Sequence, residues 1–143
     1  MFDNDDSQSV NKIKKIFDSI HNIDLQKTAD KFHPFDLKDS QNKFVVEVKK
    51  RNNTHDKYPT TMIGYNKYIK ARQYITRGYN VYFVFDYTDG IYYYKYDNEI
   101  YTPKDGGRRD RGINEIKKYI WININKLTKI EDVSSCPNEI NEP

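Results

Sequence analysis

The apolar run at residues 44–50 places an acid and a base two positions apart, Glu47 and Lys49, and its composition predicts a β-strand. Because residues i and i+2 of a strand point to the same face, Glu47 and Lys49 share one side with Val45. The opposite side is apolar and is interpreted as core: Phe44, Val46 and Val48. The strand would therefore set a carboxylate beside an ammonium group near its C-terminal end.

A second, shorter apolar segment at residues 33–37 contains Asp36. The polar stretch at residues 38–43 separates the two segments and predicts a turn. A hairpin or a bent pair of strands would then bring Asp36 beside Glu47.

Apolar positions that recur every three or four residues predict two helices. The first is expected over residues 9–21, with Ser7 or Ser9 as its cap. The second is expected over residues 62–77, ended by Gly78. Each helix would lay one apolar stripe on a sheet.

Residues 79–86 are almost wholly β-branched or aromatic and predict a central strand covered on both faces. A strand, a helix and a second strand in this order imply a right-handed crossover and parallel pairing. A turn at residues 88–90 returns residues 91–96 antiparallel at the sheet edge, and residues 119–124 predict another strand. Residues 23–31 are expected to form a loop. The predicted fold class is α/β, a mixed β-sheet flanked by helices on both faces.

The chain length of 143 residues fits one domain, expected over residues 1–130 and followed by a polar, acidic, disordered tail over residues 131–143. The net charge of +3 permits nucleic-acid binding without requiring it. The single cysteine excludes an intrachain disulfide and fits a reducing compartment. No apolar run approaches the roughly 20 residues of a membrane helix. We therefore expect a soluble, intracellular protein, in the cytoplasm of a prokaryote or virus-infected cell or in the nucleus, without a membrane partner.

Two carboxylates and a lysine gathered on one sheet have a specific chemical meaning. Carboxylate oxygens hold Mg²⁺ with waters that complete its shell. The bound ion polarises a phosphoryl oxygen and lowers the pKa of its water. A neighbouring lysine can orient that water or balance the developing charge. The alternative interpretation is an ordinary cross-strand ion pair on a solvated face, because short motifs also match by chance.

The pattern formed by Asp36, Glu47 and Lys49 resembles the PD-(D/E)xK phosphodiesterase superfamily, in its phage and viral nuclease or Holliday-junction-resolvase-like branches. The resemblance covers residues 32–96 and implies a restriction-endonuclease-like core. It implies that these three residues are catalytic, and that Asp36, Glu47 and the main-chain carbonyl of Val48 hold Mg²⁺, for which Mn²⁺ would substitute. It also implies a role in DNA recombination or repair.

The chain departs from the pattern of the superfamily at two places. Pro34 stands two residues before Asp36, and the first helix lacks the glutamate that some branches carry. The departures leave open which branch this is and whether one or two ions bind.

Basic residues outside the motif are candidates for DNA contacts. Loops positioned by a rigid sheet concentrate substrate contacts, and arginines suit phosphate binding. The candidates are Lys50 and Arg51 after the core strand, and Arg108, Arg109 and Arg111 in a glycine-rich loop. Second-tier candidates for the active site are Lys67 and Gln73, by the resemblance, and His33. The alternative for Lys67 and Gln73 is ordinary surface placement, and the alternative for His33 is a structural hydrogen-bonding role.

Three consecutive tyrosines, Tyr92, Tyr93 and Tyr94, would either stack on unpaired bases or pack in the core, and the strand pattern favours packing. The sequence as a whole predicts a Mg²⁺-dependent endonuclease that hydrolyses DNA, with a homodimer left open. Two alternatives remain: a DNA-binding protein of the same fold without catalysis, and an interaction protein in which Glu47 and Lys49 form a surface ion pair.

Overall fold

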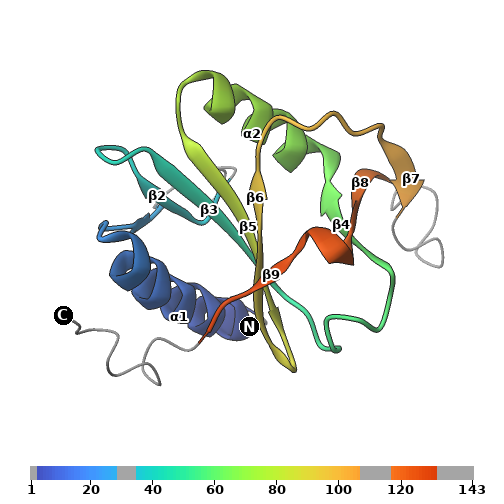
Figure 1. Ribbon diagram of the computed structural model, residues 1–143, viewed down its shortest axis with the longest axis horizontal. Coiled ribbons are helices and arrows are strands. Elements are labelled where there is room, and N and C mark those ends of the chain that lie inside the picture. Colours follow the sequence, from blue (N-terminus) through green and yellow to red (C-terminus); the bar gives the residue numbers. More distant parts are fainter. Residues whose placement is uncertain (1–2, 29–34, 107–116, 132–143) are drawn as a thin grey trace.

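The computed structural model describes residues 3–28, 35–106 and 117–131, with the side chains of the first helix described from residue 7 onward. Within these residues, a six-stranded sheet lies between helices α1 (Asp3–His21) and α2 (Tyr65–Thr76), and a three-stranded sheet lies beside it (Figure 1). The expected mixed α/β architecture with a helix on each face is confirmed. Neither described helix is long and apolar enough to cross a membrane.

The six-stranded sheet has the strand order β1-β2-β3-β5-β6-β9. Its strands are β1 (Gln26–Lys27), β2 (Leu37–Asp39), β3 (Phe44–Lys50), β5 (Asn80–Tyr87), β6 (Gly90–Tyr96) and β9 (Thr128–Lys129). Strands β3 and β5 pair in parallel, and all other neighbours pair antiparallel. Helix α2 makes the crossover that parallel pairing requires, as the sequence predicted.

Both faces of β3 are buried, each by a different helix. On one face, Ile13 and Phe17 of α1 pack in a cluster with Val46. On the other face, Tyr68 and Ala71 of α2 join a cluster with Val45. The alternation predicted for this strand is therefore confirmed, and Glu47 and Lys49 lie on the α2 side, which is also core.

The second sheet has the order β4-β8-β7 and consists of β4 (Thr60–Gly64), β8 (Lys117–Asn123) and β7 (Lys104–Gly106). The prediction that a helix begins at Met62 is wrong, because residues 62–64 continue β4 and α2 begins at Tyr65. Met62 lies opposite Trp121, and Gly64 lies opposite Tyr119. Pairing with a strand far along the chain therefore overrides the local helical periodicity.

Three other predictions need correction. Helix α1 begins before Ser9, whose buried hydroxyl donates to the carboxylate of Asp86 instead of capping the helix. The expected loop at residues 23–31 contains β1, which pairs with β2. Strand β6 is covered at its outer side by β9, so it is not the sheet edge.

The tyrosines of β6 pack as the pattern favoured. Tyr92 and Tyr94 are buried in the α2-side cluster, and Tyr93 packs against the α1-side cluster. The tail at residues 132–143 lies outside the described residues, so its expected disorder and the division into domain and tail stay predictions.

Candidate active site

The β2–β3 hairpin positions Asp36 next to Glu47. Leu37 lies opposite Val46 in the antiparallel ladder, and the amide of Asp36 donates to the carbonyl of Val46 at 3.1 Å. The amide of Val48 donates to Asp36 Oδ2 at 2.9 Å. The predicted approach of Asp36 to the Glu47–Val48 stretch is confirmed, and a main-chain hydrogen bond holds its carboxylate there.

Glu47 is almost completely buried, with 3% of its surface exposed. Lys49 Nζ lies 3.2 Å from Oε2, and Lys67 Nζ lies 3.5 Å from Oε1. No described residue makes a hydrogen bond to Oε1, although this atom is buried. The alternative of an ion pair on a solvated surface is therefore wrong for Glu47.

The environment of Glu47 raises the pKa of its carboxyl group from 4.5 to about 7. Burial is the largest cause, because it penalises the charged form, and the nearby carboxylate of Asp36 adds repulsion. The positive charges of Lys49 and Lys67, and a hydrogen bond from Lys49, act in the opposite direction. A carboxyl group with a pKa perturbed in this way is typical of functional sites.

Lys67 comes to the site from the first turn of α2. That turn has no acidic residue, and Gly64 provides no side-chain cap. A cation is unfavourable at a helix N-terminus, where the backbone dipole is positive, but the ammonium group lies within reach of Glu47. Gln73 is exposed. It follows Lys67 by six residues, so its side chain lies on another face of the helix. The structure therefore brings Lys67 to the site and leaves Gln73 away from it.

A family model described as "Phage putative PDDEXK endonuclease" matches residues 3–130. The chain belongs to this PD-(D/E)xK endonuclease family. The match spans both helices and both sheets and confirms the superfamily predicted from the sequence. Membership implies a nuclease of a class that uses divalent metal ions. Comparisons with curated proteins and with solved structures gave no match.

The basic residues that follow the motif of this PD-(D/E)xK family member take different positions. Lys50 is exposed and lies on the α1 side of β3, opposite to Lys49. Arg51 donates from Nη2 to the carbonyl of Met62 at 3.0 Å and lies over the ring of Phe85. Burial lowers the pKa of the Arg51 guanidinium group. Arg51 thus ties the end of β3 to β4.

Four other predicted contacts cannot be placed against this geometry. The candidates His33, Arg108, Arg109 and Arg111 lie outside the described residues.

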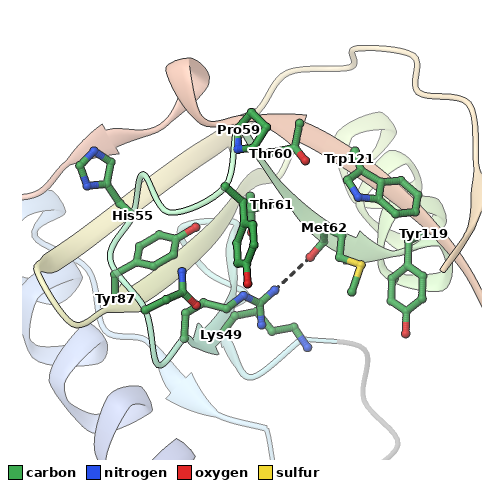
Figure 2. A pocket seen from close by; sticks show the side chains of 13 residues that line it. Lys49, His55, Pro59, Thr60, Thr61, Met62, Tyr87, Tyr119 and Trp121 are labelled. Atoms are coloured by element: carbon green, nitrogen blue, oxygen red, sulfur yellow. Dashed lines mark hydrogen bonds between the residues drawn. The ribbon is translucent and has the colours of Figure 1, made fainter. Parts of the chain in front are cut away.

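A pocket of about 560 Å³ opens beside Lys49 (Figure 2). Its walls come from the end of β3, the loop after it, the outward face of β4, and β8. The lining residues are Lys49, Arg51, Asn53, His55, Tyr58, Pro59, Thr60, Thr61, Met62, Gly64, Tyr87, Tyr119 and Trp121. Sequence reasoning predicted the strand that carries Tyr119 and Trp121 but missed its role, because no local signal indicates that it pairs with β4.

A second group of possible metal ligands in this PD-(D/E)xK family member was not anticipated. Ligand atoms of His55, Asp56 and Asp89 lie within 4.8 Å of one another, close enough to hold a metal ion. The backbone amide of His55 donates to Asp89 Oδ1, and its Nδ1 lies 2.7 Å from Oδ2. The imidazole also stacks on Tyr92, with ring centroids 4.3 Å apart. These contacts tie the loop after β3 to the β5–β6 turn.

Proposed function

We propose that the protein is an endonuclease that hydrolyses DNA phosphodiester bonds with Mg²⁺, or Mn²⁺ in its place. Asp36, Glu47 and the main-chain carbonyl of Val48 would hold the ion, and Lys49 would position the attacking water. The observation that carries this proposal is the buried Glu47 Oε1, which lacks a hydrogen bond within the described chain and lies near a second carboxylate.

The donor set fits a hard divalent cation. The buried carboxylate of Glu47 and the half-buried carboxylate of Asp36 repel each other, and a bound cation would offset both this repulsion and the cost of burying Glu47. Carboxylate and carbonyl oxygens are the ligands that Mg²⁺ prefers.

The Val48 carbonyl has a geometric argument of its own. The N–H and C=O of one strand residue point to the same side of the strand, and the Val48 amide points to Asp36. The β2–β3 ladder ends at Leu37 and Val46, so no β2 residue pairs with this carbonyl.

Each residue of the proposed site would have a separate role in hydrolysis. The Val48 amide holds one oxygen of Asp36 and thereby orients the other. Lys49, which contacts Glu47, is placed to hydrogen-bond the attacking water and to stabilise negative charge on the phosphate. Lys67 favours the ionised form of Glu47, because its charge acts to lower the pKa of that carboxyl group. When bound, the ion supplies Lewis-acid polarisation of the phosphate and a water of lowered pKa.

Three finer expectations stay predictions. They are the DNA contacts by Lys50, Arg51, Arg108, Arg109 and Arg111, the homodimer, and the role in recombination or repair. None of them carries the proposal, which depends on Asp36, Glu47 and Lys49.

Cleavage of a mixed panel of supercoiled, linear, single-stranded and branched DNA in Mg²⁺ or Mn²⁺ tests the proposal. We expect EDTA to abolish cutting, and Glu47→Gln, Asp36→Asn and Lys49→Ala each to lower it by at least about 100-fold while DNA binding survives. The matched control is Asp86→Asn, which changes another buried carboxylate on the opposite face of the sheet. Cutting that is insensitive to EDTA, or equal loss in the control, would contradict the proposal.

A further inference from the structure

Two large aromatic side chains lie on the outward face of the second sheet. Tyr119 and Trp121 alternate along β8 with Ile120 and Ile122, which are fully buried in the core. Tyr119 and Trp121 are only half-buried, with ring centroids 6.1 Å apart. This aromatic pair faces away from the core and does not fill it.

A glycine on the neighbouring strand supports these rings. A Cβ atom at Gly106 of β7 would lie 2.8 Å from Tyr119 Cδ1 and 3.1 Å from Trp121 Cη2. Only a residue without a side chain therefore lets both rings pack so closely on the backbone. The main chain thus positions the rings while one side of each is left for another partner.

The same rings line the pocket that contains Lys49. Figure 2 shows Tyr119 and Trp121 along one side of the pocket, next to Met62 on the paired strand, with Lys49 nearer the six-stranded sheet. Lys49 Nζ lies 3.2 Å from Glu47 Oε2, so the pocket shares Lys49 with the proposed catalytic centre. One continuous cavity therefore has cations at one part of its wall and aromatic faces at another.

A nucleotide is the ligand that combines the two properties of this wall. Its phosphate suits Lys49, and its base suits an aromatic face. The volume of about 560 Å³ falls in the range of small-molecule sites, roughly 300–1,000 Å³. Within a duplex each base is covered by its neighbours on both faces, so only an unpaired base can stack on the protein.

We propose that this pocket binds an unpaired nucleotide of DNA next to the scissile phosphate, with its base stacked on Trp121 or Tyr119. The substrate would then be DNA that has a single-stranded segment, in preference to continuous duplex. This inference rests on the proposed function, because it takes the phosphate beside Lys49 to be the one that is cut.

The protein contains its own probe for the test, because Trp121 is its single tryptophan. The full chain in EDTA, where cutting is not expected, is titrated with a single-stranded oligonucleotide and with a blunt duplex of the same sequence. We expect the single strand to bind more tightly and to quench tryptophan emission, whereas the duplex leaves the emission unchanged. Equal affinity for the two, or single-strand binding without a change in emission, would overturn the inference.

Substitutions separate stacking from simple apolar contact. Trp121→Leu should weaken single-strand binding by about 10- to 100-fold and change duplex binding by less than about twofold. Trp121→Phe keeps a ring and should retain most of the affinity. The control is Ile100→Ala, at a residue that is 73% exposed and outside the pocket lining, and it should change neither. If Trp121→Leu fails to fold, the single-strand and duplex affinities of Trp121→Phe, which keeps a ring, are compared with those of Tyr119→Leu, which loses one. Oligonucleotide anisotropy measures both affinities.

The two proposals fail in different ways. In one outcome, cleavage depends on metal and on Glu47, but single strand and duplex bind equally well and tryptophan emission does not change. This result would overturn the nucleotide pocket and leave the proposed function standing. In the other outcome, the single strand quenches tryptophan emission, but cleavage survives Glu47→Gln. This result would support the nucleotide pocket and overturn the assigned catalytic chemistry.

Discussion

Two buried carboxylates, Glu47 and Asp86, lie on adjacent parallel strands and on opposite faces of the same sheet. Glu47 on β3 and Asp86 on β5 are 3% and 8% exposed. Asp86 Oδ2 accepts a hydrogen bond from Ser9 Oγ at 2.8 Å and lies 3.2 Å from Lys12 Nζ. Glu47 instead keeps one oxygen without a hydrogen bond in the described part of the chain. Burial is common to both, so it does not distinguish a structural carboxylate from a functional one.

The difference comes from what each helix presents to the sheet. Helix α1 offers a hydroxyl and an ammonium group three residues apart, Ser9 and Lys12, which lie on one helical face and meet the carboxylate of Asp86 together. On the α2 side, Lys67 and Lys49 approach Glu47, but Asp36 adds a second negative charge. One carboxylate is satisfied by the fold, and the other is left with capacity for a ligand.

The largest expected effect is on the free energy of unfolding of Glu47→Gln above pH 7. Folded Glu47 binds its proton more tightly than the unfolded chain does, so its contribution favours folding below about pH 4.5 and is lost as pH rises through about 7. A pKa near 7 in place of 4.5 corresponds to roughly 3 kcal/mol. We therefore expect the amide variant to be more stable than wild type by up to that amount at pH 8, and nearly equal to it at pH 4, in urea unfolding. Equal stability at both pH values would show that the carboxylate carries no such cost.

Asp86→Asn should have the opposite sign. The substitution removes the charge that Lys12 pairs with and weakens the hydrogen bond of the buried Ser9 hydroxyl. We expect a loss of about 1–3 kcal/mol in the free energy of unfolding at pH 8. Stabilisation by this substitution in the same urea experiment would remove the distinction drawn between the two carboxylates.

The two helical lysines provide the next comparison. Lys67→Met should lower cleavage about 10-fold, because Lys67 helps keep Glu47 ionised. At subsaturating Mg²⁺, wild-type cleavage should rise with pH through about 7, because Glu47 must lose its proton to bind the ion, and removal of the Lys67 charge should move this rise to higher pH. The control Lys12→Met removes an ammonium group that pairs with Asp86 on the opposite face of the sheet, and it should leave the rate and its pH profile unchanged. An unchanged pH profile in Lys67→Met would count against the assigned role.

The smallest effect is expected at Lys50. Its side chain leaves β3 on the α1 side, away from Glu47, so Lys50→Ala should change low-salt cleavage by no more than about twofold. Lys49 and Lys50 are neighbours on opposite faces of β3. Comparing cleavage by Lys49→Ala and Lys50→Ala therefore tests whether only the face that contains Glu47 contributes to activity. A loss at Lys50 as large as at Lys49 would mean that DNA wraps around the sheet edge.

Local pattern was enough to predict β3, β5 and the hairpin that brings Asp36 to Glu47. Successive side chains of a strand point to opposite faces, so position in the sequence assigns each residue to a face, and a short polar turn restricts where the chain can return. The start of α2 could not be predicted in the same way, because residues 62–64 have helical periodicity but pair with β8.

The sequence by itself determined strands β3, β5, β6 and β8, the two faces of β3 and the carboxylate–lysine motif, because these follow from residue types a few positions apart. Only the tertiary structure decided that Lys67 reaches Glu47 while Gln73 does not, and that Asp86 is satisfied by α1. It also decided that the outward face of β8 forms a wall of the pocket beside Lys49. These outcomes depend on how helices and sheets pack across long separations in the chain, and no local pattern of residues records that packing.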